Sequence, residues 1–261
     1  MKIDDIKKIC VIGAGNMGHQ IAMLAAVNGY VVGCAESNPE QLKKAEEFTA
    51  SYLPGRVAKG RLTAEQAEAI GNNLRFTASL EEAAAGADFA IEAVTEKIAL
   101  KRSIFEQLDQ ITPPHAILAT NSSFFVSSLL GSATGRPEKI CNMHFFNPAL
   151  VMKCVEVVKG PDTAEETALV TMELARRLGK EPVLLNKEIY GFLVNRILAA
   201  INNEALYLLE MGVATPEDID SAVVNALGHP LGPFRLMDLT GIDLSYHITM
   251  ERYQASGEAE D

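Results

Sequence analysis

The feature that most constrains this chain is a glycine pattern near the N-terminus, Gly13-Ala-Gly15-Asn-Met-Gly18. It follows a β-branched apolar run, Lys8–Ile12, and precedes a segment with helical periodicity, Met17–Asn28. Between a strand and a helix, such glycines make a tight turn, leave room for a pyrophosphate and allow close helix–strand packing. The N-terminus of the helix would then offer N–H groups to phosphate. The motif alone also fits a plain glycine turn.

An acidic residue after the next apolar run supports a dinucleotide-binding loop. Glu36 follows Tyr30–Ala35 and lies 23 residues after Gly13, near the spacing of about 20 residues expected for such a fingerprint. A carboxylate there hydrogen-bonds the ribose hydroxyls of NAD and would repel the 2′-phosphate of NADP. A solvated strand end is the alternative for Glu36. The sequence therefore predicts that NAD is bound by Gly13, Gly15, Asn16, Met17, Gly18 and Glu36.

Beyond this loop, apolar β-type runs alternate with helix-like segments. Further strands are expected at Asp88–Ala93, Ala116–Thr120, Lys139–His144, Met152–Val158 and Glu181–Leu185. Helices are expected at Pro39–Ala58, Thr63–Ile70, Lys97–Gln110 and Ala164–Leu178. Repeated strand–helix units with short connections predict an α/β fold with a parallel, doubly wound sheet of Rossmann type.

The last third of the chain shows a helical pattern. Phe192–Met211 reads as a long apolar helix, and Thr215-Pro216 reads as the start of another. A rigid loop is expected at Gly228–Phe234, then more helix towards Tyr253, and a polar, frayed end. We therefore expect a Rossmann-type NAD-binding domain over residues 1–187 and a smaller all-α domain over residues 188–261.

Composition limits the partners and the compartment. The formal net charge of −11 argues against a nucleic-acid binder, although local cations and backbone N–H groups can still hold an anionic ligand. No apolar run approaches the roughly 18 to 20 residues of a membrane span, and the N-terminus is too polar for a signal peptide. The four cysteines form no C-x-x-C pair, which favours buried thiols in a reducing compartment. We expect a cytoplasmic protein that binds neither nucleic acid nor membrane.

Four downstream motifs carry a more specific signal. They are Thr120-Asn-Ser-Ser123, Met143-His-Phe-Phe-Asn-Pro148 with Lys153-Cys-Val-Glu-Val157, Gly191-Phe-Leu-Val-Asn-Arg196, and Gly228-His-Pro-Leu-Gly-Pro-Phe234. This ordered set resembles the NAD-dependent L-3-hydroxyacyl-CoA dehydrogenases, and among them the bacterial 3-hydroxybutyryl-CoA dehydrogenases, over most of the chain. The resemblance implies hydride transfer between NAD and C3 of a short-chain (3S)-3-hydroxyacyl-CoA in fatty-acid metabolism. It also implies a homodimer formed through the helical domain.

A histidine and a glutamate fit the proton chemistry of such a reaction. Oxidising a secondary alcohol needs a base, and histidine exchanges protons near neutral pH. His144 ends an expected strand, where the carboxyl edge of the sheet borders the ligand crevice. Glu156 follows 12 residues later, enough for the chain to return along the next strand and hold the imidazole. The resemblance assigns His144 as acid/base and Glu156 as its orienter. An isolated pair would more simply be a core histidine and a strand-end glutamate.

The resemblance also assigns other site residues, each with a structural alternative. Ser123 and Asn195 would contact the 3-oxygen of the substrate, and Ser123 also the cofactor. They could instead be a loop cap and a polar residue at a helix start. Asn147 would contact the nicotinamide ribose region or shape the turn before Pro148. Glu96 and Lys101 would lie on the cofactor side, or on a solvated helix start. Lys59, in the cationic run Gly55–Arg61, would meet a CoA phosphate or lie on a solvated helix end.

No metal is expected, because Cys141-x-x-His144 has no second pair of ligands.

The sequence departs from the family at several positions. Phe124 replaces a serine, Glu188-Ile-Tyr190 replaces Asp-x-Pro, and Tyr52 stands where a small polar CoA contact is expected. These changes leave acyl-chain selectivity open. They also keep two alternatives, a dehydrogenase of a free hydroxy acid or sugar acid and a non-catalytic NAD-binding structural protein. Related chains continue with a Gly-Arg-Lys-Thr-Gly segment that does not occur here, so the helical domain is expected to lack its last segment.

Overall fold

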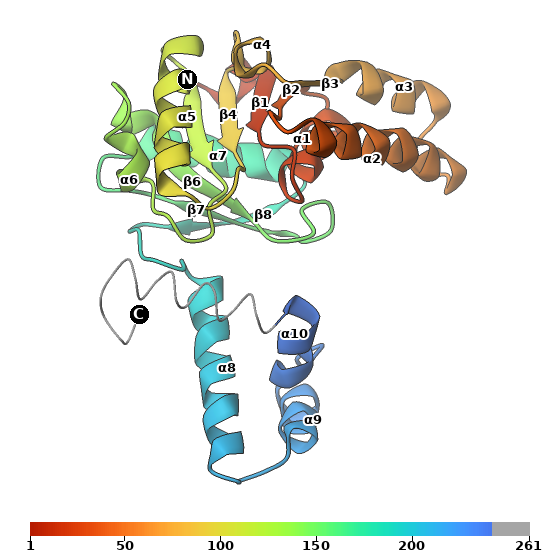
Figure 1. The fold of residues 1–261 in the computed structure, drawn as a ribbon, viewed down its shortest axis with the longest axis vertical. Helices are drawn as coiled ribbons and strands as arrows, with labels where there is room; N and C mark the ends of the chain where they lie inside the picture. Colours follow the sequence, from red (N-terminus) through yellow and green to blue (C-terminus); the bar gives the residue numbers. More distant parts are fainter. Residues whose placement is uncertain (242–261) are drawn as a thin grey trace. The chain divides into compact units, whose positions relative to one another are not determined.

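Eight short strands in the described part of the chain form a single sheet (Figure 1). They are β1 (Lys8–Ile12), β2 (Val31–Ala35), β3 (Leu74–Thr77), β4 (Phe89–Glu92), β5 (Ile117–Thr120), β6 (Ile140–Phe145), β7 (Cys154–Val158) and β8 (Glu181–Leu185). The strand order in this computed structural model is β3-β2-β1-β4-β5-β6-β7-β8. The six strands from β3 to β6 run parallel, as a doubly wound sheet requires.

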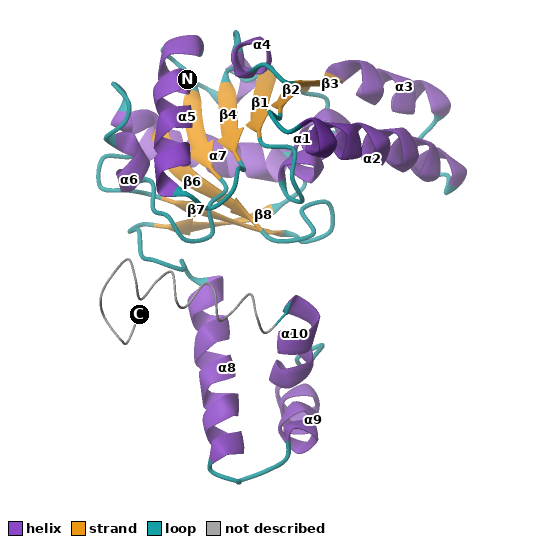
Figure 2. Ribbon diagram, in the orientation of Figure 1, coloured by secondary structure: helices purple, strands orange, loops and turns teal. Residues whose placement is uncertain are grey.

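Helices cover both faces of this sheet (Figure 2). Those packed on one face are α1 (Gly18–Val27), α2 (Pro39–Ala58), α3 (Ala64–Asn73) and α7 (Glu165–Arg177). Those on the other face are α4 (Leu80–Ala84), α5 (Ile98–Ile111) and α6 (Ser128–Gly131). Short 3-10 turns occur at Ile3–Asp5 and Pro137–Lys139.

Alternation along β1 explains why the strand runs are almost wholly apolar. Ile9 and Val11 point into one core, whereas Cys10 and Ile12 point into the other. Successive side chains of a strand face opposite ways, so a strand covered on both faces needs apolar residues at every position. The sequence signal for the strands is therefore a continuous apolar run.

Capping residues set the start of α2 and α3. Asn38 accepts hydrogen bonds from the amides of Glu40 and Gln41, so α2 begins at Pro39 as predicted. Thr63 and Gln66 form the predicted reciprocal capping box of α3. In both helices a capping side chain next to the first turn marks where the helix begins.

The sheet differs from the expected all-parallel arrangement at β7. This strand pairs antiparallel with β6, and β8 then runs parallel to β7. The connection between β6 and β7 holds no crossover helix, which a parallel pair would need. Sequence analysis also did not predict β3, α4 and α6, each of which is five residues or shorter.

The structure describes residues 1–241 and divides the chain into two units, one of Met1–Phe192 and one that begins at Leu193. The second unit contains α8 (Val194–Glu210), α9 (Pro216–Leu227) and α10 (Pro233–Thr240). The expected loop from Gly228 is shorter than predicted because α10 already begins at Pro233. The helix expected towards Tyr253 and the frayed end lie outside the described residues.

None of the helices that the structure describes is both long and apolar enough to cross a membrane.

Candidate active site

The glycine loop joins β1 to α1 and needs glycine for three different reasons. Gly13 has a φ of 93°, and a Cβ there would lie 2.7 Å from the carbonyl oxygen of Ala93. A Cβ on Gly18 would lie 1.8 Å from the carbonyl oxygen of Gly13. A Cβ on Gly15 would meet nothing within 4 Å. Gly13 and Gly18 thus allow close packing, whereas Gly15 presents bare backbone to open space, where a pyrophosphate fits.

Glu36 is tied to this loop, which excludes a purely solvated role. One carboxylate oxygen accepts the amide of Ala14 at 2.8 Å, and the other accepts the amide of Asn38 at 2.8 Å. The side chain lies half-buried beside the first turn of the glycine loop. It is therefore held where a carboxylate can reach ribose hydroxyls. The loop and Glu36 together fit NAD.

A second contact joins the glycine loop to the segment after β6. The amide nitrogen Nδ2 of Asn16 donates to Oδ1 of Asn147 at 3.2 Å, and both side chains are exposed. The peptide bond between Asn147 and Pro148 is cis. Asn147 therefore contacts a residue of the glycine loop, as a cofactor-side residue should.

His144 and Glu156 lie directly opposite each other on β6 and β7. Nδ1 of His144 is 2.8 Å from Oε2 of Glu156. The histidine is 5% exposed and the glutamate 0%, so the contact lies away from bulk water. A carboxylate in this position fixes the ring orientation and stabilises an imidazolium. The antiparallel pairing of β6 and β7 creates this contact.

Two aromatic rings flank the imidazole. The ring centroids of Phe146 and Phe192 lie 4.6 Å and 5.5 Å from that of His144. Phe192 is 1% exposed and has a φ of 51°, which is unusual for a bulky residue. Sequence analysis placed Phe192 at the start of a helix. The structure corrects this, because α8 begins at Val194 and the Phe192 side chain packs into the first unit.

Lys101 is not part of a solvated helix start. It is 1% exposed, and its Nζ lies 2.8 Å from Glu92 and 3.0 Å from Glu96. Glu96 also accepts a hydrogen bond from the hydroxyl of Ser122. Glu92 is fully buried and was missed by sequence analysis. The sequence offers one sign of this pair, because Glu92 ends an apolar strand nine residues before Lys101.

Two adjacent serines in the turn after β5 differ in their contacts. The hydroxyl of Ser122 accepts the amides of Phe124 and Phe125, so Ser122 is the residue that caps this turn. Ser123 is half-buried, and its side chain makes no hydrogen bond within residues 1–241. Ser123 is thus the serine available to a ligand.

Two of the family departures contact each other. The ring of Phe124 lies 5.1 Å from that of Tyr190. Phe124 is 7% exposed. The bulky residue beside Ser123 therefore packs against the tyrosine that replaces the family proline, as one aromatic pair.

The cationic run lies at the C-terminal end of α2. Lys59 is the C-cap of this helix and is exposed. Arg56 lies 5.8 Å from the ring centroid of Tyr52, which stacks on Phe48 at 5.3 Å. Tyr52 therefore belongs to a stacked side-chain group with Phe48 and Arg56.

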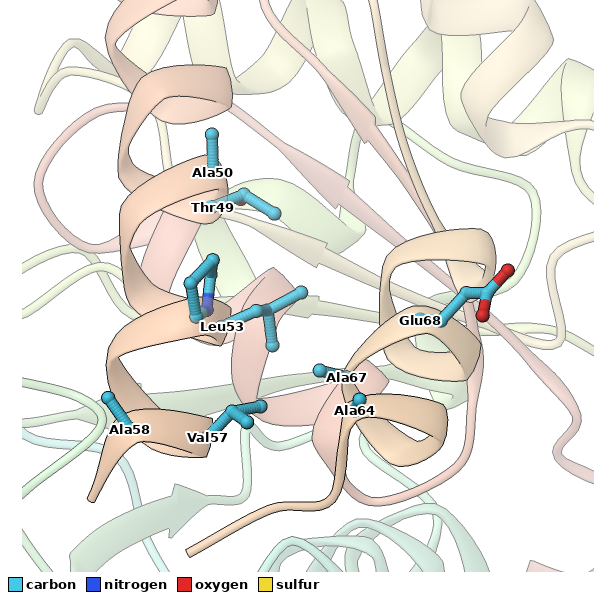
Figure 3. Close-up of a pocket in the computed structure, with 9 residues that line it drawn as sticks. Thr49, Ala50, Leu53, Val57, Ala58, Ala64, Ala67 and Glu68 are labelled. Carbon is cyan, nitrogen blue, oxygen red and sulfur yellow. The ribbon is translucent and has the colours of Figure 1, made fainter. Parts of the chain in front are cut away.

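A cavity of about 600 Å³ lies elsewhere, between α2 and α3 (Figure 3). Leu53, Val57, Ala64 and Ala67 line it and give it an apolar wall. None of the predicted site residues lines it.

Asn195 lies in the first turn of α8, in the second unit.

The Cys141-x-x-His144 pair does not form a metal site. Successive residues of β6 face opposite ways, and Cys141 packs into the core against Thr171 at 3.4 Å. Burial raises the pKa of the Cys141 thiol to about 12. Within the described residues no cluster of three histidine, cysteine or acidic side chains is arranged to hold a metal.

Comparison with known proteins places this chain in a family. Residues 8–189 match the family described as 3-hydroxyacyl-CoA dehydrogenase, NAD binding domain, and residues 191–261 match its C-terminal domain. The chain is 40% identical over 255 residues to a probable 3-hydroxybutyryl-CoA dehydrogenase of Bacillus subtilis, across 98% of this chain and 88% of that protein.

Solved structures are similar over almost the same length. The (S)-3-hydroxybutyryl-CoA dehydrogenase of Ralstonia eutropha is 33% identical with a TM-score of 0.90, covering 97% of this chain and 89% of that one. The Escherichia coli 3-hydroxybutyryl-CoA dehydrogenase is 38% identical with a TM-score of 0.91, covering 96% of this chain and 52% of that one. This chain therefore belongs to the 3-hydroxyacyl-CoA dehydrogenase family and is an NAD-dependent dehydrogenase.

Proposed function

We propose that this enzyme interconverts short-chain (3S)-3-hydroxyacyl-CoA and 3-ketoacyl-CoA, with 3-hydroxybutyryl-CoA and acetoacetyl-CoA as the main pair. The observation that carries the proposal is the buried contact of 2.8 Å between His144 and Glu156 at the carboxyl edge of a sheet with an NAD-type glycine loop. The names of the relatives in Bacillus subtilis and Ralstonia eutropha support the substrate class.

His144 acts as the acid/base in this proposal. Its Nδ1 contacts Glu156, so Nε2 is the nitrogen that takes the hydroxyl proton of the alcohol or returns it to the ketone oxygen. Glu156 orients the ring and stabilises the imidazolium. Gly13–Gly18 and Glu36 would hold NAD, which would supply the hydride acceptor for the alcohol and the hydride donor for the ketone. Asn147, Glu96 and Lys101 hold the nicotinamide side.

Two uncharged groups stabilise the 3-oxygen. Its negative charge grows as the ketone is reduced, and hydrogen-bond donors aimed at it lower the barrier. Ser123 supplies a hydroxyl from the turn after β5, and Asn195 supplies an amide from the first turn of α8.

The CoA phosphates bind the cationic run at the end of α2. Lys59 is exposed there, with Arg56 and Arg61 close in sequence. Lys59→Ala should raise the KM for acetoacetyl-CoA and leave kcat unchanged, because it removes an equal contact from ground and transition states. Lys43→Ala is the matched control, since Lys43 is an exposed lysine on the same helix. Equal KM values in the two variants would remove Lys59 from the site.

A substrate panel tests the proposed activity. Ketoacyl-CoA substrates of increasing chain length and the corresponding free acids are each mixed with NADH, and NADH absorbance is followed. We expect kcat/KM for acetoacetyl-CoA to exceed that for acetoacetate by about a hundredfold or more, because binding energy from CoA lowers the barrier. Comparable rates with free acids would indicate a free hydroxy-acid dehydrogenase. NADH binding without turnover of any substrate would indicate a non-catalytic NAD-binding protein.

We also propose a homodimer formed through the helical unit. Large apolar side chains are exposed on this unit, namely Ile197, Tyr207, Met211, Val213, Leu227 and Leu239. Exposed apolar surface of this kind marks interaction sites. Light scattering should give twice the chain mass, and Tyr207→Glu should reduce it towards the monomer value. A monomeric wild type would contradict this assembly.

We propose that the enzyme works in the reducing cytoplasm. Cys10, Cys34, Cys141 and Cys154 are free thiols, and burial raises the pKa of Cys10 to about 12. Such thiols are unreactive and are typical of reducing compartments. Cell fractionation should place the activity with the cytoplasmic fraction, and recovery in a secreted fraction would contradict it.

A further inference from the structure

Glu92 carries a fully buried carboxylate that the proposed chemistry does not use. It ends β4 and is 0% exposed. Four hydrogen bonds satisfy it, two from Nζ of Lys101 at 2.8 and 3.1 Å, one from the amide of Val94 at 2.7 Å and one from the hydroxyl of Thr120 at 2.7 Å. A buried charge is kept only where it is paired in this way, so its function lies in what it connects.

The contacts of Glu92 close into a ring. Lys101 also bonds Glu96 at 3.0 Å, and Glu96 accepts the hydroxyl of Ser122. The amide of Ser122 donates to the hydroxyl of Thr120 at 3.0 Å, and that hydroxyl donates to Glu92. The ring of Glu92, Lys101, Glu96, Ser122 and Thr120 thus ties the turn after β4 to the turn after β5.

Glu92 is also linked, through Asn121, to the strand that carries His144. The carbonyl oxygen of Glu92 accepts the amide of Asn121 at 2.7 Å. Oδ1 of Asn121 accepts the amide of Phe145, the neighbour of His144, at 2.9 Å. Glu92 therefore stands at the junction of three segments, those that carry Glu96, Ser123 and His144.

We propose that Glu92 is a positioning residue for hydride transfer, an inference that rests on the function proposed above. Its carboxylate holds the cofactor-side turn and the Ser123 turn in one fixed relation. Because the ring contains two carboxylates and one ammonium, loss of the Glu92 charge leaves Glu96 as the one charged partner of Lys101 within the ring. The two turns are then held together less rigidly, and Ser123 is placed less precisely beside the reacting carbon.

Glu92→Gln tests this role, with Asp109→Asn as the matched control. Asp109 forms the comparable ion pair with Arg136 at 2.6 Å, on the other end of α5 and outside the ring. We expect kcat with acetoacetyl-CoA to fall about tenfold or more in Glu92→Gln, because small misplacements of reacting groups are costly. The NADH Kd, measured by NADH fluorescence in a chain without tryptophan, should change by less than about threefold. Asp109→Asn should keep wild-type kcat.

Hydrogen exchange supplies a readout that does not depend on the reaction. Amides of residues 93–97 and 121–125 should exchange faster in Glu92→Gln and at the wild-type rate in Asp109→Asn. Unchanged exchange in these turns, or a kcat loss equal to that of the control, would overturn the proposal. If the wild type fails to reduce acetoacetyl-CoA, the proposed function fails, and the exchange result alone then decides the role of Glu92.

Thr120 provides a second route if Glu92→Gln does not fold. Thr120→Val removes the hydroxyl that closes the ring but keeps the side-chain shape. It should lower kcat and speed exchange in the same turns, and Thr120→Ser should restore both because it restores the hydroxyl. A Thr120→Val enzyme with wild-type kcat would overturn the proposal.

Discussion

At the scale of single residues, two side chains face each other because of strand register. His144 and Glu156 are register partners on β6 and β7, with 2.8 Å between Nδ1 and Oε2. In the proposed mechanism the imidazole carries a positive charge during turnover, and Glu156 is the buried carboxylate beside it. The charge of Glu156, and not merely its shape, should therefore govern the rate.

Glu156→Gln tests that statement. We expect kcat to fall by about a hundredfold or more, because a neutral amide neither stabilises an imidazolium nor enforces the required tautomer. Steady-state rates with acetoacetyl-CoA and NADH measure the loss. Glu181→Gln, an exposed change at the start of β8, is the control and should keep the wild-type rate. A Glu156→Gln enzyme that matched this control would show that the carboxylate is dispensable.

The glycine loop gives a second residue-scale prediction. Gly15→Ala should leave the melting temperature unchanged, because its Cβ meets nothing within 4 Å. It should weaken NADH binding by about tenfold, since the methyl group occupies the pyrophosphate space. Gly18→Ala should instead lower stability by about 1–3 kcal/mol through overpacking, because its Cβ would lie 1.8 Å from a carbonyl oxygen. NADH titration and thermal unfolding of both variants should show opposite patterns, and identical patterns would refute this division of roles.

A candidate site residue could be predicted where its distance along the sequence from another motif residue indicated its place. The 12-residue interval between His144 and Glu156 spans the turn from β6 to β7, and the 23-residue interval between Gly13 and Glu36 spans α1 and β2. Glu92 and the burial of Lys101 could not be predicted, because both depend on α5 folding back over the end of β4. A lone glutamate or lysine in sequence does not reveal a partner that only tertiary packing supplies.

At the scale of elements, the first amides of α10 are capped by a side chain of another helix. Its N-cap is Gly232, which has no side chain to accept the first amides. Asp220 of α9 accepts the amides of Phe234 and Arg235 at 2.8 and 3.0 Å. A Cβ on Gly232 would lie 2.4 Å from that of Asp220, so glycine leaves room for this carboxylate.

Removing this cap should loosen the helical unit. Asp220→Ala should cost about 1–2 kcal/mol, the usual value of a lost N-cap, and Asp220→Asn should cost less because one acceptor remains. Urea unfolding and amide exchange in α10 measure the effect. The control is Ser221→Ala, an exposed change on the same helix. Equal stability of Asp220→Ala and the control would show that the cap is unimportant.

Several elements marked by a capping residue or a continuous apolar run could be predicted from sequence, whereas three short elements could not. The bounds of α2 follow from Asn38-Pro39, and β1 matches its apolar run. The strand β3 has four residues, and α4 and α6 have five and four, too few for a period to emerge. The antiparallel direction of β7 could be predicted only from the short return between His144 and Glu156, because an apolar run does not itself encode whether it pairs parallel or antiparallel.

At the scale of the whole molecule, the acidic composition makes stability depend on pH. Burial alone would raise the pKa of Asp88 and Asp109, but hydrogen bonds outweigh it and hold both below the ordinary value of 3.8. For Asp88 these come from His115 and the amides of Lys8 and Lys7. For Asp109 they come from the amide of Gly135 and from Arg136.

These two carboxyls should make the fold acid-labile. The unfolded chain binds more protons at these sites than the folded chain, so stability rises with pH across this range. The contribution is fully present above about pH 4 and is lost as pH falls through the folded pKa values. Urea unfolding between about pH 2 and pH 6 should show this slope. The double variant Asp88→Asn, Asp109→Asn should show a shallower one, and an unchanged slope would assign the acid sensitivity to other groups.

The central claim is that this NAD-dependent enzyme reduces a 3-ketoacyl-CoA with His144 as its acid/base. The most direct measurement compares the wild type with His144→Gln in NADH oxidation by acetoacetyl-CoA, alongside NADH titration of both. The wild type should oxidise NADH, and the variant should lose about a hundredfold or more of kcat while binding NADH as tightly. A wild type that does not oxidise NADH, or a variant that keeps the wild-type rate, would contradict the account.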